Sequence, residues 1–342
     1  MNIEIINPID YPNWDGLLLT NPAATFFHTS AWAQVLAESY KYKPLYFSII
    51  DNKKLSALIA LMEIKSFLTG NRGVSLPFTD ECAPIVSDPE QQEAFIEAVI
   101  RHGKTAGWSH FELKGGNAHF TGKAHSSFYT HTLDLTQGAN EIFSAFRNSN
   151  KRNIKRALRE DLQVDIRDSL ESMRSFYQLN CLTRKLHGLP PQPWHFFKKI
   201  HEHIISAKNG FVALARVKEK IIAGAVYFHF NGRAIFKYGA SDRRDQHLRP
   251  NNLVMWRAIQ WCIEHGCRQL SLGRTEIRNE GLLQFKRGWR GKEENLQYFK
   301  YDFKKCNFII ENQSFMLSQP FFKLLPSLLS RWTGNILYRH VG

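Results

Sequence analysis

The sequence is short of the features that mark secreted and membrane-spanning proteins. Its 342 residues include five cysteines, an odd number, at positions 82, 181, 262, 267 and 306. A scattered odd set argues against a disulfide framework, so we expect a reducing compartment such as the cytoplasm. No apolar run approaches the roughly 18–20 residues of a spanning helix. The opening residues also lack the basic and apolar regions of a signal peptide, so none is expected.

Ligand sets for metal or covalent catalysis are missing as well. Cys262, His265 and Cys267 lie closest together, but no fourth ligand is near them. We therefore expect ordinary core or surface thiols rather than a zinc site. The sequence shows no Ser-His-Asp or Cys-His arrangement for nucleophilic catalysis. We expect no metal and no covalently bound cofactor.

The composition favours a globular chain that meets an anionic partner. Hydrophobic residues make up 43% and aromatic residues 13%, and the length suits two domains of ordinary size. Forty-five lysines and arginines against 31 acidic residues give a net charge of +14. This excess favours tRNA, a nucleotide, a phospholipid surface or a phosphorylated substrate, without choosing among them. DNA is not among the partners that we expect.

The two halves of the chain repeat one order of elements. The first half is expected to hold a hairpin, a helix and a strand, at 45–62, 90–103 and 108–113. The second half is expected to hold the same elements at 211–230, 250–265 and 269–272, with one more strand at 234–238. We predict two α/β (α+β) domains of one design, at 1–145 and 146–310, and a tail at 311–342. Chance similarity of two common α/β patterns is the alternative.

One stretch near the end of the second half is the best candidate for chemistry. Gln269–Leu272 alternates like a strand, and Gly273 is expected to stop it before a polar loop at 274–278. Asn279 is placed to cap a helix that ends near Gly288. Open α/β sheets bind ligands at the carboxyl ends of their strands, which is where this loop and helix would lie. A solvated basic loop is the alternative.

A basic helix is predicted between the halves. The segment 147–159 carries six basic residues, and Ile154, Ala157 and Leu158 could face a core. Its outer face then gathers cations, which are Arg152, Lys155, Arg156 and Arg159. Crowded like charges destabilise a helix, so either an anionic partner or plain solvation accounts for this face.

The tail contains an amphipathic segment at 318–333, with Lys323 and Arg331 as its charges. It would either dock on the protein or lie on a bilayer surface. The second outcome would place the protein peripherally on the inner face of the membrane.

Several motifs, in order, resemble one family. They are His28–Trp32, Leu76–Phe78, Lys151–Ala157, Thr183-Arg184, Tyr238–Ser241, Arg249–Leu253, His265-Gly266, Leu272–Arg274 and Gln284–Trp289. The chain up to about Phe303 resembles the Fem aminoacyltransferases, which add amino acids to peptidoglycan precursors. It is equally similar to related GNAT-type acyltransferases of exopolysaccharide and cell-envelope systems. The resemblance implies a tandem of two GNAT-like domains, each a mixed twisted sheet flanked by helices.

The resemblance also implies roles for particular residues. Phe285-Lys286 matches a functionally important aromatic-lysine pair, and Arg184 matches an arginine that contacts the acceptor. The chain lacks the coiled-coil arm of some Fem enzymes. It also lacks the Gly-rich turn that holds pyrophosphate in acetyl-CoA enzymes, and Arg249–Asn252 stand there instead. Free N–H groups at that helix start can still hold a phosphate.

Acyl transfer to an amine needs an activated donor, a neutral amine and stabilisation of the oxyanion. The donor would be aminoacyl-tRNA or an acyl thioester, either acyl-CoA or acyl carrier protein, and the acceptor an envelope precursor, sugar amine or amino acid. We expect Lys286 and Phe285 to be catalytic, with Lys286 stabilising anionic charge. The expected substrate-binding residues are Arg152, Lys155, Arg184, His187, Tyr238, Asn252, Arg274, Glu276, Gln284 and Trp289. A nonenzymatic adaptor on RNA or a membrane surface is the rival hypothesis.

Overall fold

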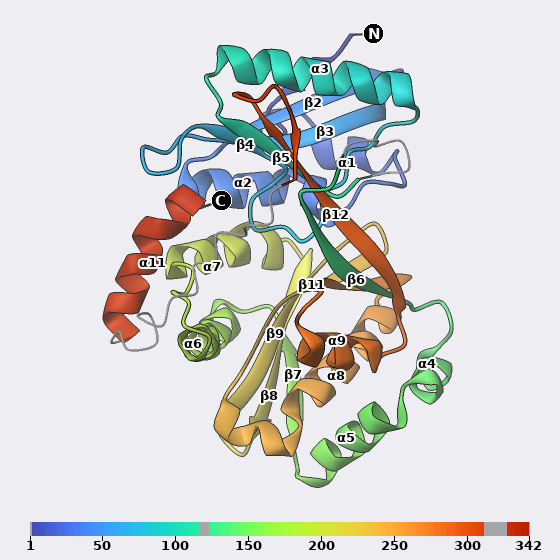
Figure 1. Cartoon of the computed structure of the whole chain (residues 1–342). Helices are drawn as coiled ribbons and strands as arrows, with labels where there is room; N and C mark the ends of the chain where they lie inside the picture. The colour runs from blue at the N-terminus through green and yellow to red at the C-terminus, as the bar shows by residue number, and fades with distance from the viewer. Residues whose placement is uncertain (1, 117–122, 311–326, 342) are drawn as a thin grey trace. The chain divides into compact units, whose positions relative to one another are not determined.

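The structure is a computed structural model that describes residues 2–116, 123–310 and 327–341 (Figure 1). These residues form two compact units. Unit 1 comprises described residues 2–116, 123–128, 295–310 and 336–341, and unit 2 comprises 129–294 and 327–335. The sequence-based division at 145 and 310 therefore differs from the units. The reason is that residues 295–302 belong to a strand that pairs within unit 1.

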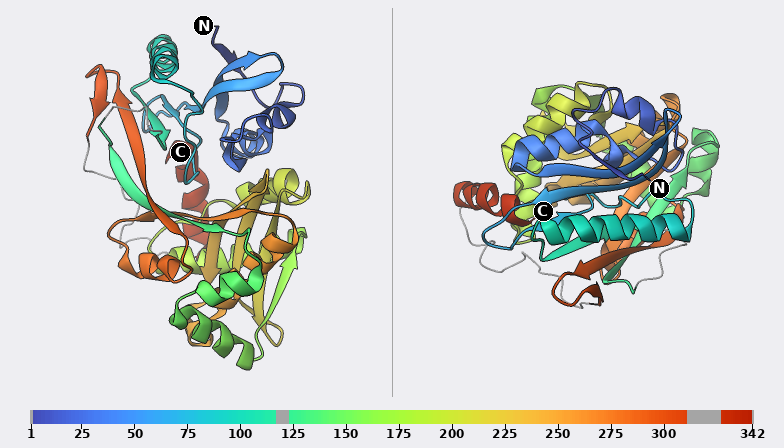
Figure 2. Two further views of the ribbon diagram at one scale, coloured as in Figure 1. Left: turned by 90° about the vertical axis from the view of Figure 1, so that its right-hand side faces the viewer. Right: turned by 90° about the horizontal axis from the view of Figure 1, so that it is seen from above.

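Unit 1 is a mixed sheet with helices on both faces (Figures 1 and 2). Its strands are β1 (Glu4–Ile6), β2 (Lys43–Asp51), β3 (Lys54–Ile64), β4 (Arg72–Val74), β5 (His110–Lys114), the larger part of β12 (Lys292–Asp302) and β13 (Asn307–Ile309). They lie in the order β1-β2-β3-β4-β5-β12, with β13 on β12. Among the strands described in this unit, only β4 and β5 pair in parallel. The helices are α1 (Trp14–Leu18), α2 (Ser30–Tyr40) and α3 (Pro89–Thr105).

Alternation along β2 explains why both faces of this sheet are covered. Phe47 points toward α3, where its ring meets His102 edge-on at 5.8 Å. Its neighbour Tyr46 points to the opposite face and meets Trp14 of α1 at 5.5 Å. Both faces are therefore apolar, and β2 is buried from Pro44 to Ile49. The predicted hairpin and helix of the first half are confirmed.

His28 belongs to the motif His28–Trp32 and has a structural role in unit 1. Its Nδ1 accepts a hydrogen bond from the Thr25 N–H at 3.0 Å, and its Nε2 lies 3.3 Å from the Ala83 carbonyl oxygen. The imidazole is fully buried, and burial lowers its pKa to about 4 from 6.5. Thr29 caps α2 by accepting from the Trp32 N–H.

Acidification should therefore destabilise the protein through His28. The unfolded chain binds a proton at His28 below pH 6.5, whereas the folded chain does so only near pH 4. Between these values the free energy of unfolding should fall by about 3 kcal/mol on this account. Urea unfolding at pH 7, 5.5 and 4.5 should show a weaker pH dependence for His28→Gln than for the wild type. Parallel pH profiles for the two proteins would refute the assignment.

Unit 2 is a second mixed sheet. Its strands are β6 (Ser126–Asp134, in this unit from Tyr129), β7 (Gln163–Arg167), β8 (Gly210–Val217), β9 (Lys220–Phe230), β10 (Arg233–Ser241) and β11 (Gln269–Glu276). They lie in the order β7-β8-β9-β10-β11-β6. The helices are α4 (Ala139–Ala145), α5 (Asn148–Arg159), α6 (Leu170–Leu186), α7 (Trp194–Ile200), α8 (Pro250–Glu264) and α9 (Glu280–Arg287), with short helical turns at His201–Ile205 and Arg243–Leu248.

Helices also cover both faces of the second sheet. Phe211, Ala213 and Ala215 of β8 join the core that α8 closes. On the other face, Gly224 of β9 lies against Phe176 of α6, where a Cβ would come within 3.4 Å of the ring and within 2.7 Å of Leu214. The predicted strands and helices of the second half are present, and so is the basic helix, as α5.

Most of the predicted amphipathic tail, residues 318–326, lies outside the described residues. The remainder falls in α11 (Ser327–Val341). Within 2–116, 123–310 and 327–341, no helix is long and apolar enough to cross a membrane.

Candidate active site

The site begins where two parallel strands part. β10 and β11 pair only from Arg233 with Gln269 to Ile235 with Ser271, although both strands continue beyond these positions. A register shift between Phe236 and Tyr238 marks the same point on β10. Beyond this point the N–H and C=O groups of β10 and β11 that face each other need other hydrogen-bond partners, because buried peptide groups are rarely left unpaired.

The prediction that Gly273 stops the strand is wrong. β11 runs on through Arg274 and Thr275 to Glu276, so the residues predicted as a loop are largely strand. The physical reason is the neighbour on its other side, β6, which adjoins β11 in the sheet although it lies far away in sequence. A strand with one remaining neighbour can continue after the other has left.

Lys286 forms hydrogen bonds with β11 beyond the point where β10 stops pairing with it. Its Nζ donates to the carbonyl oxygens of Gly273 at 2.8 Å and Arg274 at 3.0 Å. The residue is only 2% exposed. α9 delivers it: Asn279 caps the helix by accepting from the Leu282 N–H at 3.2 Å, and Leu283 and Lys286 face inward one turn apart. A buried ammonium group therefore lies at the carboxyl end of β11.

The aromatic neighbours of Lys286 belong to the core. Phe285 and Trp289 meet edge-on at 5.8 Å, and Trp289 packs against Phe146 at 5.0 Å. Trp289 is 1% exposed. Gln284 points outward and is exposed. Phe285 and Trp289 therefore hold α9 on the sheet, and through it they position Lys286.

The start of α8 lies at the end of β10. Pro250 occupies the first turn, and Arg249 precedes it in the left-handed region at φ 62° with no side-chain cap. Asn251 Nδ2 donates to Ser241 Oγ at 3.2 Å, which ties the helix start to β10. Asn252 is buried beside it. An uncapped helix start presents N–H groups and the positive end of the helix dipole, which suits a phosphate.

α6 brings further candidates to the same end of β10. Thr183 Oγ1 accepts from the Ser241 N–H at 3.1 Å and donates to the Ser241 carbonyl oxygen at 3.3 Å. Half-buried Arg184 follows it, with Nε 3.4 Å from the Pro190 carbonyl oxygen. Tyr238 packs edge-on against Phe197 of α7 at 5.4 Å. Thr183 and Asn251 thus meet at Ser241, whereas Arg184 contacts the loop at Pro190 and Tyr238 packs on α7.

The remaining predicted residues fall into two groups. Arg274 and Glu276 are exposed near the carboxyl end of β11. His187 is exposed and directly follows α6. Arg152 and Lys155 lie elsewhere in unit 2, on the exposed face of α5. A hydrogen bond nevertheless links the start of α5 to the end of α9. The N–H of Arg147, directly before α5, donates to the Gly288 carbonyl oxygen at 3.0 Å.

A buried histidine joined to two more exposed charged residues lies beside Lys286, and the sequence did not predict it. His131 on β6 is fully buried, with Nε2 2.8 Å from Glu293 Oε2. Arg287 holds the same carboxylate with two bonds, at 2.6 and 2.8 Å. These bonds lower the pKa of Glu293. The pKa of His131 is lowered, mainly by burial. The contact with Glu293 opposes this shift, and the charges of Lys286 and Arg287 add to it. No sequence spacing links these residues, because β6 and β12 are distant along the chain.

Comparisons with known proteins identify the fold. Residues 144–287, which include the parted strands and α9, match the family described as acetyltransferase (GNAT) domain. FemX shares the fold with a TM-score of 0.69 at 12% identity, over 86% of this chain and 96% of FemX. The tandem GNAT protein from the clavulanic acid biosynthesis pathway gives 0.54 at 7% identity, over 88% and 99%.

A third solved structure, L-PGS from Bacillus licheniformis, has a TM-score of 0.52 at 12% identity, over 89% of this chain and 92% of that protein. No curated protein matches the sequence significantly. The predicted resemblance is confirmed: residues 144–287 match a GNAT acetyltransferase domain, and the chain as a whole has the fold of a tandem of GNAT-like units.

Proposed function

We propose that unit 2 is an acyltransferase that forms an amide bond between a donor acyl or aminoacyl group and an amine of a cell-envelope precursor. One observation carries the proposal. In the segment that matches the GNAT family, two parallel strands part, and a buried lysine and an uncapped helix start lie at their carboxyl ends. This is the place where an open α/β sheet binds ligands.

The reaction requires little covalent chemistry from the protein. The neutral amine attacks the donor carbonyl carbon, a C–N bond forms, and the C–O bond to tRNA or the C–S bond of a thioester breaks. The amine proton ends on the departing hydroxyl or thiol. In this proposal the α8 start holds a donor phosphate, and Lys286 stabilises the negative charge that develops. Glu276 is exposed beside the strand end and would accept the proton. Positioning of the reactants supplies much of the rate.

The donor is either aminoacyl-tRNA or an acyl thioester. The basic face of α5 favours the first, because its exposed cations suit the phosphates of RNA. The start of α8 serves either donor. The match of residues 144–287 to a GNAT acetyltransferase domain and the likeness to FemX and a tandem GNAT protein support acyl transfer in general. A nonenzymatic adaptor is the second candidate, favoured by the same α5 face.

The full chain should be incubated in parallel with acetyl-CoA, an acylated carrier protein and charged tRNA, each with a peptidoglycan-precursor peptide and with an amino sugar. Mass spectrometry should find an amide product for one donor class, with equimolar release of free thiol or uncharged tRNA. Product formation with none of the donors, by protein that still binds RNA, would favour the adaptor.

A further inference from the structure

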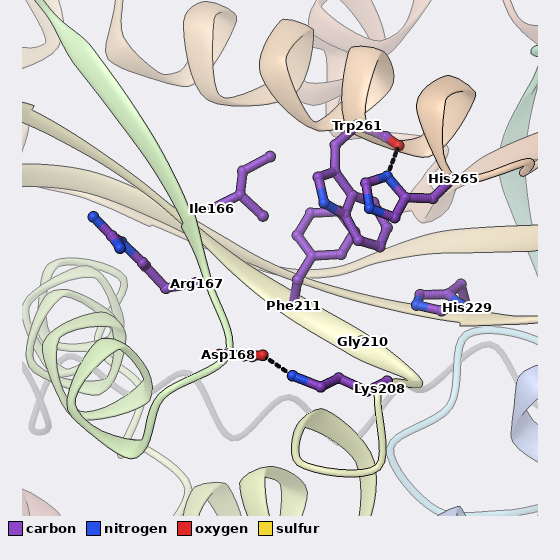
Figure 3. Close-up of a pocket in the computed structure, with 9 residues that line it drawn as sticks. All are labelled: Ile166, Arg167, Asp168, Lys208, Gly210, Phe211, His229, Trp261 and His265. Atoms are coloured by element: carbon purple, nitrogen blue, oxygen red, sulfur yellow. Dashed lines mark hydrogen bonds and ion pairs between the residues drawn. The ribbon is translucent and has the colours of Figure 1, made fainter.

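A cavity lies at the opposite end of α8 from the candidate active site. Its volume is about 580 Å³. Its walls come from the end of β7, the start of β8 with the loop before it, the end of β9 and the C-terminal end of α8 (Figure 3). α8 has 15 residues, so its two ends are about 22 Å apart along the helix axis. The cavity is therefore separate from the carboxyl ends of β10 and β11.

Aromatic rings line one wall of this cavity. Trp261 lies between Phe211, at a ring distance of 4.0 Å, and His265, which stacks on it at 3.8 Å with a 15° angle. Phe211 is buried and stacks on Tyr227 at 4.9 Å. His265 is fixed because its Nδ1 lies 2.8 Å from the Trp261 carbonyl oxygen. The wall is thus rigid and already assembled, which favours binding of a flat apolar body.

Polar groups gather on the remaining walls. His229 is half-buried and faces the cavity, and within the described part of the chain its ring nitrogens have no hydrogen-bond partner (Figure 3). Lys208 forms an ion pair with Asp168 across the cavity mouth. Arg167 also lines the cavity, but its side chain points away from Phe211, Trp261 and His229 and lies 3.6 Å from Asp165 (Figure 3). The lining therefore offers an anion the ring nitrogens of His229 and the ammonium group of Lys208, which an incoming anion would share with Asp168.

We propose that this cavity binds a small planar aromatic acid. The ring would pack against Phe211 and Trp261, and its carboxylate or phosphate would bind His229 and Lys208. A purely apolar ligand would leave the half-buried imidazole of His229 without a partner, which is unfavourable. A small inorganic anion would leave the aromatic wall uncovered. The volume suits a ligand of this size. The inference is independent of the acyl-transfer proposal.

Three probes with a common ring test the proposal. Calorimetric titration of the full chain should show binding of indole-3-acetate. Indole and tryptamine should bind at least about tenfold more weakly, because the first lacks the anion and the second carries a cation toward Lys208. Benzoate and phenyl phosphate distinguish a carboxylate from a phosphate ligand. The proposal would be overturned if no aromatic acid bound at 10 mM, about 10⁻² M, a concentration beyond the range of a useful site. It would also be overturned if tryptamine bound more tightly than indole-3-acetate.

Variants locate the site. Ile166→Trp fills the cavity from half-buried β7 and should abolish binding of indole-3-acetate. Lys208→Ala removes an exposed cation, leaves folding unaffected, and should weaken binding about threefold. Lys198→Ala on α7 is the matched control, because it is exposed and does not line the cavity. Unchanged binding by both Ile166→Trp and Lys208→Ala would show that the acid binds elsewhere and would refute the proposal.

Discussion

Replacing Lys286 with methionine should abolish amide formation and also lower the free energy of unfolding by about 2–4 kcal/mol. Methionine keeps an apolar stem of similar length but removes the donor that serves two carbonyl oxygens of β11. Each buried carbonyl left without a partner costs about 1–3 kcal/mol. Urea unfolding and the amide-forming assay measure the two effects on the same preparation.

The control for this substitution is Lys292→Met, which changes an exposed lysine that forms an ion pair with Glu294. It should leave both stability and activity near the wild-type values. Lys286→Arg retains the charge and should recover part of the stability. If Lys286→Met remained fully active in the amide-forming assay, the lysine would have no part in catalysis.

Reversing the charges of α5 should weaken tRNA binding by at least about a hundredfold at low salt. Arg152, Lys155 and Arg159 are exposed, and among the described residues no ion pair holds them. Changing all three to glutamate should therefore spare the fold, because Ile154 and Ala157 still bury the inner face. The slope of log affinity against log salt should also become shallower by about three. Filter binding across a salt series measures both effects.

Arg101→Glu with Lys104→Glu on α3 is the comparison, since it also reverses exposed cations on a helix, in unit 1. It should change tRNA affinity far less. Equal losses for the two variants would indicate a general effect of net charge. Undiminished binding by the α5 variant would exclude α5 as the RNA surface and favour a thioester donor.

Local patterns predicted the part of the site that depends on neighbours in sequence. Asn279 was expected to cap a helix ending near Gly288, and it does so in α9. Alternation and Pro250 placed α8 and its preceding strand in the same way. These features follow from capping and side-chain periodicity, which a single stretch of sequence contains.

The parts that were missed depend on strands from distant segments. β11 continues past Gly273 because β6 lies beside it, and no residue near Gly273 reveals that neighbour. The sequence also did not predict that Lys286 donates to the carbonyl oxygens of Gly273 and Arg274, because it did not predict that β11 extends to these residues. The cluster of His131, Glu293 and Arg287 likewise needs β6 and β12 to be known together. The boundaries of the two units differ from the predicted ones because β12 pairs with β5 from Tyr298 to Asp302.

Native mass spectrometry of the protein purified from its own host tests the central claim most directly. The account predicts a bound anionic acyl donor, a CoA ester, an acyl carrier protein or an RNA, in equimolar amount with the chain. Added donor of the same class should restore the complex after the ligand is removed. A chain that emerges free and then binds none of the three donors would contradict the account.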